Sequence, residues 1–294
     1  MPRTVRGMGM VSTVGLVLHP ERDSKEAIDT IVEWARNRGC PVLGLPDEVG
    51  RIDCSAVAVD DQTLVRQADL LVSLGGDGTM LRTMRLIAGR PTPVLGVNLG
   101  RLGFLAEIDV ADLAPALSAI DEHRYTVEPR MAVRATTHDG RTVTAFNDIA
   151  LVRIPGDGLA AVAVSVYGEP FVRYAADAVI VSTATGSTAY SFSAGGPIVS
   201  PTVEGFIVVP AAAHTAFNRA LVLSADEEVT LDVLPTSGQL AMEVDGAIGG
   251  HLCPGDRLTV TALRAAARVV RLGTTTFYER ARRKLRVNGS AEVD

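Results

Sequence analysis

The sequence ADLLVSLGGDGT, residues 68–79, joins an apolar run to a glycine-rich turn. The run Ala68–Leu74 is continuous, which is typical of a strand buried on both faces of a parallel sheet. Met80–Ala88, directly after the turn, has a helical pattern, and Thr79 is placed to cap the N-terminus of that helix. Because glycine tolerates positive φ and leaves space at the backbone, the turn is tight and open to a ligand. The segment predicts a strand, a turn and a helix in direct succession.

The predicted turn has the features of a phosphate site. A helix N-terminus presents free N–H groups and a partial positive charge, and Gly75, Gly76, Gly78 and Thr79 are the candidate binding residues. A carboxylate among phosphates is repelled unless it binds Mg²⁺ or accepts a proton from an attacking hydroxyl. Asp77 therefore predicts phosphoryl transfer and is the candidate catalytic residue. The alternative is an ordinary strand-to-helix turn.

Strand and helix patterns alternate over residues 1–125. Val14–Leu18 and Pro93–Val97 are short apolar runs, and Ser24–Arg38 and Val110–Ile120 have the pattern of helices. This alternation predicts an α/β domain with a parallel sheet.

From Thr126 onward the pattern changes to strands separated by turns. Strands are expected at Met131–Thr137, Thr142–Val152, Ala161–Val166, Phe171–Tyr174, Phe206–Val209, Glu228–Leu234, Leu240–Val244, Arg257–Ala262 and Ala267–Leu272. Few helices interrupt them, which predicts a second, mostly antiparallel, β-rich domain over residues 126–272. Residues 273–294 form a last segment in which Phe277–Arg286 has the pattern of a basic, solvated helix.

The composition excludes several classes of protein. The 294 residues are 47% hydrophobic and 21% charged, as in ordinary soluble globular proteins. A net charge of −6 argues against a nucleic-acid partner, and no apolar stretch is long enough for a membrane span. Neither the P-loop motif nor the protein-kinase motifs occur. Three cysteines and five histidines fit no metal-ligand spacing, so we expect reduced thiols, a cytoplasmic protein and no metal-ligating residues.

Several motifs resemble those of one known family. Gly75-Gly76-Asp77-Gly78-Thr79 occurs in a superfamily of NAD kinases, 6-phosphofructokinases, diacylglycerol kinases and sphingosine kinases. Further stretches are similar to NAD kinases in particular, namely GVNLGRLGFLAE at 96–107, Asn147-Asp148, STATGSTAYSFSAGGP at 182–197, Asp245-Gly246 and FYERARRKLR at 277–286. The chain is identified as a member of the NAD kinase family, of the bacterial, actinobacterial type.

The resemblance implies a fold and an activity. The fold would be an α/β N-terminal domain and a β-rich C-terminal domain, with the site in the cleft between them and residues 273–294 packed back on the first domain. The activity would be phosphorylation of the 2′-hydroxyl of the adenosine ribose of NAD, giving NADP, with Mg²⁺ and with ATP or polyphosphate as the donor. The protein would be a homodimer or homotetramer in which a neighbouring subunit completes the site.

The resemblance also assigns roles to single residues. Asp77 would be the general base at the 2′-hydroxyl, Gly78 would lie against the dinucleotide, and Asn147 and Asp148 would hold the adenosine of NAD. Further binding residues are implied at Asp177, Thr188, Ala189, Tyr190, Ser193 and Asp245. The chemistry of residues 185–193 suits this assignment, because their hydroxyls can hydrogen-bond a sugar and the tyrosine ring can stack on a base.

A few positions depart from the family pattern and leave other functions open. Asp148 stands where the family has glutamate, and Ala176-Asp177-Ala178 stands where it has Gly-Asp-Gly. Ala178 would be strained if its position requires positive φ. The first alternative is therefore a non-catalytic NAD(P)(H)-binding paralogue that senses the cofactor pool. The second, a lipid or sugar kinase that shares the glycine turn, is disfavoured by the sequence at 182–197.

Overall fold

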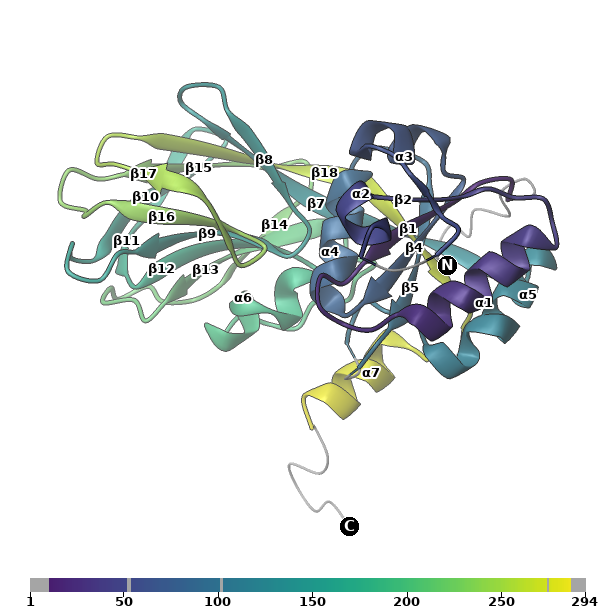
Figure 1. Ribbon diagram of the computed structural model, residues 1–294. Coiled ribbons are helices and arrows are strands. Elements are labelled where there is room, and N and C mark those ends of the chain that lie inside the picture. The colour runs from purple at the N-terminus through teal and green to yellow at the C-terminus, as the bar shows by residue number, and fades with distance from the viewer. Residues whose placement is uncertain (1–10, 52–53, 101–102, 274, 287–294) are drawn as a thin grey trace, which may run out of the picture. The chain divides into compact units, whose positions relative to one another are not determined.

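The structure, a computed structural model, describes residues 11–51, 54–100, 103–273 and 275–286. The chain forms two compact units (Figure 1). The first unit consists of residues 1–129 and 267–294, and the second consists of residues 130–266. One long strand, β18 (Arg257–Arg271), belongs to both units, because its first half pairs with β15 and its end pairs with β5.

The first unit is built on a parallel sheet. Its strands have the order β5-β4-β1-β2-β3, and β5 also pairs with β6. Their bounds are Val14–Leu18 (β1), Val42–Gly44 (β2), Val57–Ala58 (β3), Leu70–Gly75 (β4), Pro93–Asn98 (β5) and Ile108–Asp109 (β6). Every residue of β1, β4 and β5 is buried, as their unbroken apolar runs predict. The expected α/β domain with a parallel sheet is confirmed.

Helices accompany these strands. They are α1 (Lys25–Arg36), α2 (Pro46–Val49), α3 (Asp61–Gln67), α4 (Asp77–Leu86), α5 (Leu113–Asp121) and α7 (Phe277–Lys284). Helices α1 and α5 lie side by side (Figure 1), and Trp34 Nε1 donates to Asp121 Oδ2 over 3.0 Å. The short elements β2, α2, β3 and α3 have too few residues to show a period, so the sequence did not predict them.

Helix α4 begins earlier than expected. Asp77 is its first residue and Gly76 is its N-cap, so the prediction of Thr79 as the cap is wrong. The Thr79 side chain is buried beneath the end of β4 instead, where a Cβ added to Gly75 would lie 2.1 Å from Thr79 Oγ1. Glycine at position 75 lets Thr79 pack this close to the end of β4. The strand therefore passes into the helix with only Gly76 between them, and Asp77 lies in the first helical turn.

The second unit contains two antiparallel sheets. One has the order β14-β13-β12-β9-β16-β17, and the other joins β11, β10, β15 and β18, with β7 beside β18 and β8 beside β7. The bounds are Thr126–Thr137 (β7), Thr142–Ala145 (β8), Asp148–Arg153 (β9), Ala160–Val166 (β10), Glu169–Ala176 (β11), Ala178–Thr183 (β12), Gly205–Ala211 (β13), Leu221–Ser224 (β14), Glu228–Val233 (β15), Leu240–Val244 (β16) and Ala247–Leu252 (β17). Apolar residues of both sheets, such as Val181 and Leu231, form one core. The predicted β-rich, mostly antiparallel part is confirmed.

Some predicted strands differ from the observed ones. The expected strand Thr142–Val152 is two strands, because the chain breaks at Phe146-Asn147, where its backbone turns to a carboxylate described below. The two strands expected between Arg257 and Leu272 are one. Ala178 lies within β12, fully buried and without positive φ, so the strain considered at this position does not arise.

Candidate active site

The turn after β4 directs one carboxylate into a network of donors. Asp77 Oδ1 accepts the N–H of Leu105 over 3.0 Å, and Oδ2 accepts the N–H of Phe104 over 3.0 Å. Lys284 Nζ lies 3.2 Å from the same Oδ2. Asp77 remains 27% exposed. The carboxylate is therefore fixed by a loop and by the last helix, yet still reaches solvent.

The loop can approach this carboxylate only because residue 103 is glycine. A Cβ at Gly103 would lie 2.1 Å from Asp77 Oδ1 and 2.9 Å from Oδ2. Real Cβ atoms do not come so close, so any side chain here must displace either the loop or the carboxylate. The sequence GVNLGRLGFLAE thus has a physical role at its second half, although residues 101 and 102 lie outside the described residues.

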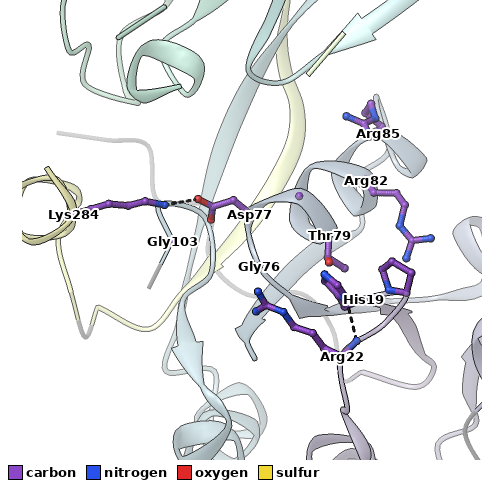
Figure 2. A pocket seen from close by; sticks show the side chains of 11 residues that line it. His19, Arg22, Gly76, Asp77, Thr79, Arg82, Arg85, Gly103 and Lys284 are labelled. Atoms are coloured by element: carbon purple, nitrogen blue, oxygen red, sulfur yellow. Dashed lines mark hydrogen bonds and ion pairs between the residues drawn. The ribbon is translucent and has the colours of Figure 1, made fainter. Parts of the chain in front are cut away.

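Asp77 lies in the wall of a cavity of about 570 Å³ that carries an excess of positive charge. The cavity is lined by backbone of the glycine turn, by Gly103, and by side chains that include His19, Arg22, Thr79, Arg82, Arg85 and Lys284. Figure 2 shows Lys284 reaching Asp77 from one side, with His19, Arg22 and Arg82 on the other. Asp77 is the carboxylate among these described lining residues. The excess of positive charge favours binding of an anion in this cavity.

Two side chains of the cavity wall are held in place by hydrogen bonds to the surrounding fold. Arg82 Nη2 lies 2.5 Å from Glu48 Oε1 and donates to the carbonyl of Leu18 over 2.6 Å. His19 Nδ1 accepts the N–H groups of Glu21 and Arg22, each over 3.1 Å. In the neutral imidazole, the ring proton is therefore on Nε2. Arg82 and His19 are thus oriented before any ligand arrives.

The last helix is not the solvated helix expected from its composition. Arg280 is 3% exposed, and its Nη2 lies 2.6 Å from Glu107 Oε2. Arg271 Nη1 pairs with the same oxygen over 2.8 Å, and Leu272 N–H donates to Glu107 Oε1 over 2.8 Å. A buried carboxylate shared by two guanidinium groups is compensated by charge and by hydrogen bonds. This cluster fixes α7 to the loop that holds Asp77.

A second set of predicted residues gathers in the second unit around Asp245. Its carboxylate accepts the N–H groups of Phe146, Asn147 and Asp148 over 3.2, 2.6 and 3.3 Å. Asp245 has φ of 48° and Gly246 has φ of 79°, as a two-residue hairpin turn between β16 and β17 requires. A hairpin turn is therefore present at Asp245-Gly246, and its aspartate also shapes the strand start at Asn147-Asp148.

The hydroxyl-rich segment packs against this strand start. Asn147 carbonyl accepts the N–H of Thr183 over 2.9 Å and the hydroxyl of Ser182 over 3.2 Å. After β12 the chain forms a short turn over Gly186–Thr188 and the helix α6, Tyr190–Ser193. Thr188, Ala189 and Tyr190 are half-buried, and Ser193 is exposed. Hydroxyls and a ring are therefore presented at the end of β12.

Burial and nearby negative charge raise the pKa values of Asp148 and Tyr190 in this second set. Burial, followed by the charges of Asp245 and Glu243, raises the pKa of Asp148 to about 7. Burial, followed by the charges of Glu243, Asp148 and Asp177, raises the pKa of Tyr190. Asp177 is close enough for its charge to act on Tyr190. Its Oδ1 also pairs with Arg153 Nε over 2.5 Å. The structure thus brings Asp148, Tyr190 and Asp245 together, while Asp177 is engaged by an arginine.

The structure therefore contains two arrangements. The first is the cationic cavity with the Asp77 carboxylate, and the second is the group of acceptors and hydroxyls near Asp245 and the end of β12. An acidic phosphate donor suits the first and a sugar hydroxyl suits the second, so by class the protein is a phosphotransferase. Residues 14–125 match the family model of the ATP-NAD kinase N-terminal domain, and residues 146–272 match that of the ATP-NAD kinase C-terminal domain. The chain belongs to the NAD kinase family.

Individual proteins give the same result. The chain is 39% identical to NAD kinase 1 of Streptomyces avermitilis, with 94% of this chain and 87% of the relative covered. It is 38% identical to the NAD kinase of Moorella thermoacetica, over 96% and 91%. The crystal structure of yeast NADH kinase complexed with NADH superposes with a TM-score of 0.85 at 26% identity, over 97% of this chain and 90% of that one. The crystal structure of an Archaeoglobus fulgidus NAD kinase in complex with ATP superposes with a TM-score of 0.72 at 25% identity, over 94% and 100%.

Several residues of the cavity were not predicted from the sequence. They are His19, Arg22, Arg82, Arg85 and Lys284. The anchoring pair of Glu107 and Arg280, which supports α7 without lining the cavity, was not predicted either. Lys284 had a signal, because the chain contains two lysines and one lies in the FYERARRKLR motif. The cavity arginines had none, since the 28 basic residues are almost all arginines.

Proposed function

We propose that this NAD kinase uses Asp77 as the general base for transfer of the γ-phosphoryl group of ATP to the 2′-hydroxyl of the adenosine ribose of NAD. The bond between the ribose 2′-oxygen and phosphorus forms, the bond from phosphorus to the β,γ-bridging oxygen breaks, and ADP leaves. The hydroxyl proton passes to the Asp77 carboxylate. The observation that carries the proposal is a partly exposed carboxylate, at a helix N-terminus, in the wall of a cationic cavity.

The donor phosphates would occupy the cavity of the first unit. Its charge supports this, because guanidinium and ammonium groups bind phosphate oxygens and stabilise the charge that builds up on a transferring phosphoryl group. The first turn of α4, with Gly76, Gly78 and Thr79, adds the positive end of a helix dipole. ATP is the donor we favour over polyphosphate, because the solved relative from Archaeoglobus fulgidus holds ATP.

The dinucleotide would be held by the second set of residues. Asn147 and Asp148 offer oxygen acceptors for ribose hydroxyls, and Asp245 holds both of their backbones in place. Further contacts would come from Thr188, Ala189, Tyr190 and Ser193 at the end of β12, and from Asp177. The half-buried ring of Tyr190 is suited to stacking on a base.

Mg²⁺ is the cofactor that the family implies, and the residues present fit it. Among the described residues there is no cluster of three or more histidine, cysteine or acidic side chains that could hold a metal alone. Mg²⁺ in such enzymes uses one or two carboxylates together with substrate phosphates and water, and Asp77 would hold it through Oδ1, which accepts one N–H, while Oδ2 serves as the base. Bound there with the donor, the ion would neutralise charge on the phosphates.

Assembly and location remain part of the proposal. A homodimer or homotetramer is supported by the edge strands of one sheet, where Val222 on β14 and Ile248 on β17 are 60% and 68% exposed. A cytoplasmic enzyme is supported by the thiols Cys40, Cys54 and Cys253, all free. No helix in the described part of the chain is long and apolar enough to cross a membrane.

The test is a product assay with one variant and one control. The purified protein is incubated with Mg-ATP and NAD, then with NADH, and the 2′-phosphorylated product is followed by mass spectrometry. We expect product from the parent and a loss of at least 1,000-fold in Asp77→Asn. The matched control is Asp61→Asn, at the exposed start of α3, which should retain full rate. Full activity in Asp77→Asn would refute the role of Asp77. A folded parent that binds NAD and forms no product would favour the non-catalytic sensor.

A further inference from the structure

Lys284 forms an ion pair with Asp77, the proposed general base. Its Nζ lies 3.2 Å from Asp77 Oδ2 and 4.9 Å from the centroid of the Phe104 ring. Its side chain is 38% exposed and lines the same cavity as Asp77 (Figure 2). The ammonium is therefore within reach both of the carboxylate and of any anion that enters the cavity.

The position of Lys284 is built into the fold. Lys284 follows Arg280 by four residues on α7, so both side chains lie on one face of the helix. Arg280 is anchored in the buried cluster with Glu107, and the Arg280 Nη1 donates to the carbonyl of Ala106 over 2.5 Å. At the other end, Thr276 Oγ1 caps the helix by accepting the N–H of Glu279 over 3.2 Å. The helix is thus held so that its last turn presents an ammonium to Asp77.

The hydrogen bonds of Asp77 show why this contact matters for a base. A carboxylate has about four lone-pair positions, and three of them on Asp77 face Leu105 N–H, Phe104 N–H and Lys284. The two N–H partners belong to the backbone of the loop and are fixed. Lys284 is the mobile partner, because its ammonium is on a flexible stem. The position that can be vacated at Oδ2 is the one that Lys284 fills.

We propose that Lys284 couples donor binding to the proton acceptor: its ammonium pairs with Asp77 in the empty site and passes to the terminal phosphoryl group of the bound donor. This inference rests on the proposed function. A γ-phosphoryl group carries more negative charge than a carboxylate and attracts the ammonium more strongly. The transfer vacates one lone-pair position on Oδ2 for the proton of the 2′-hydroxyl. It also places a positive charge beside the phosphoryl group as it moves.

The scarcity of lysine makes a direct test possible. The chain has two lysines, Lys284 and Lys25, and Lys25 lies on α1, exposed and paired with Asp29 over 3.2 Å. Lysine labelled with ¹³C at Cε therefore gives two side-chain NMR signals, assigned with Lys25→Gln. We expect the Lys284 signal to shift on saturation with Mg²⁺ and a non-hydrolysable ATP analogue, and to shift far less with Mg-ADP. In Asp77→Asn, the empty protein should already show a displaced Lys284 signal. An unmoved Lys284 signal with the ATP analogue, or an equal shift with Mg-ADP, would overturn the proposal.

Kinetics separate this role from a structural one. Lys284→Gln should lower kcat about 100-fold, as the loss of a donor to transition-state charge does, and leave the KM for NAD and the melting temperature unchanged. Lys284→Arg should recover part of the rate, and Lys25→Gln should match the parent. Parental kcat in Lys284→Gln would refute the coupling while the kinase assignment stands. If the parent itself forms no NADP, the proposed function fails, and the NMR shift then reports on donor binding alone.

Discussion

The two units carry opposite local charge at their proposed sites. In the first unit, one carboxylate, Asp77, is outnumbered by Arg22, Arg82, Arg85 and Lys284 in the cavity wall. In the second unit, the charges of Asp245 and Glu243 raise the pKa of Asp148, and Asp177 pairs with Arg153. The difference matches the two substrates of a kinase. A polyphosphate needs cations, while a ribose diol needs hydrogen-bond acceptors.

The two sites also differ in how their key carboxylate is held. Asp77 is 27% exposed and is surrounded by donors, whereas Asp148 is 3% exposed and is surrounded by like charges. Donors fix the direction of a carboxylate, and like charges with burial favour its neutral form. The first arrangement suits a group that must stay aimed at a reacting atom, and the second suits a group whose charge changes near neutral pH.

After Asp77→Asn itself, the largest expected effect comes from crowding the Asp77 carboxylate in the first unit. Gly103→Ala places a Cβ where Asp77 Oδ1 now lies 2.1 Å away, so the carboxylate or the loop must move. A displacement of about 1 Å at a reacting group costs about 100-fold in rate. We expect kcat to fall by at least that factor with little change in the KM for NAD, measured by NADP formation. A melting temperature near that of the parent serves as the control, and a parental kcat would contradict the placement of Asp77.

The next effect concerns stability in the second unit. The pKa of Asp148 is about 7 in the folded chain, against an ordinary value of 3.8 for an aspartate. Its contribution to stability is therefore full below pH 4 and is lost as the pH rises through 7. Asp148→Asn does not carry this cost, so the variant should be more stable than the parent at pH 8 by about 4 kcal/mol, with little difference near pH 4. Thermal melts at both pH values measure it, and a pH-independent difference would count against a buried, titrating Asp148.

A smaller effect is expected from Asp245, whose carboxylate holds the backbone of the proposed dinucleotide-binding residues Asn147 and Asp148. Asp245→Asn keeps a residue that tolerates positive φ but weakens the bonds to the N–H groups of Asn147 and Asp148. Loss of a charge-assisted hydrogen bond is worth about 1.5 kcal/mol. We expect the KM for NAD to rise about tenfold while the KM for Mg-ATP stays constant. A rise in the KM for Mg-ATP alone would reverse the assignment of the two sites.

Much of the fold was predictable, and the cavity was not. Long apolar runs such as Ala68–Leu74 and the alternation of strands and helices are local signals, and they gave the parallel sheet and the β-rich part. The glycine turn and Asp77 were found because a carboxylate in such a turn is unusual. Lys284 and Arg82 come to the cavity from distant or unremarkable positions, through the anchors Arg280 and Glu48. Partners far apart in sequence leave no periodic trace, so these residues needed the structure.

The division of charge between the two sites is the central claim, and a crossed comparison of KM values tests it most directly. At pH 8, Arg22→Gln removes a cation of the cavity, and Asp148→Asn removes a charged acceptor of the second unit. We predict that the first variant raises the KM for Mg-ATP about tenfold and leaves the KM for NAD within about twofold, and that the second variant does the reverse. The same KM rising in both variants, or the two effects exchanged, would contradict the account.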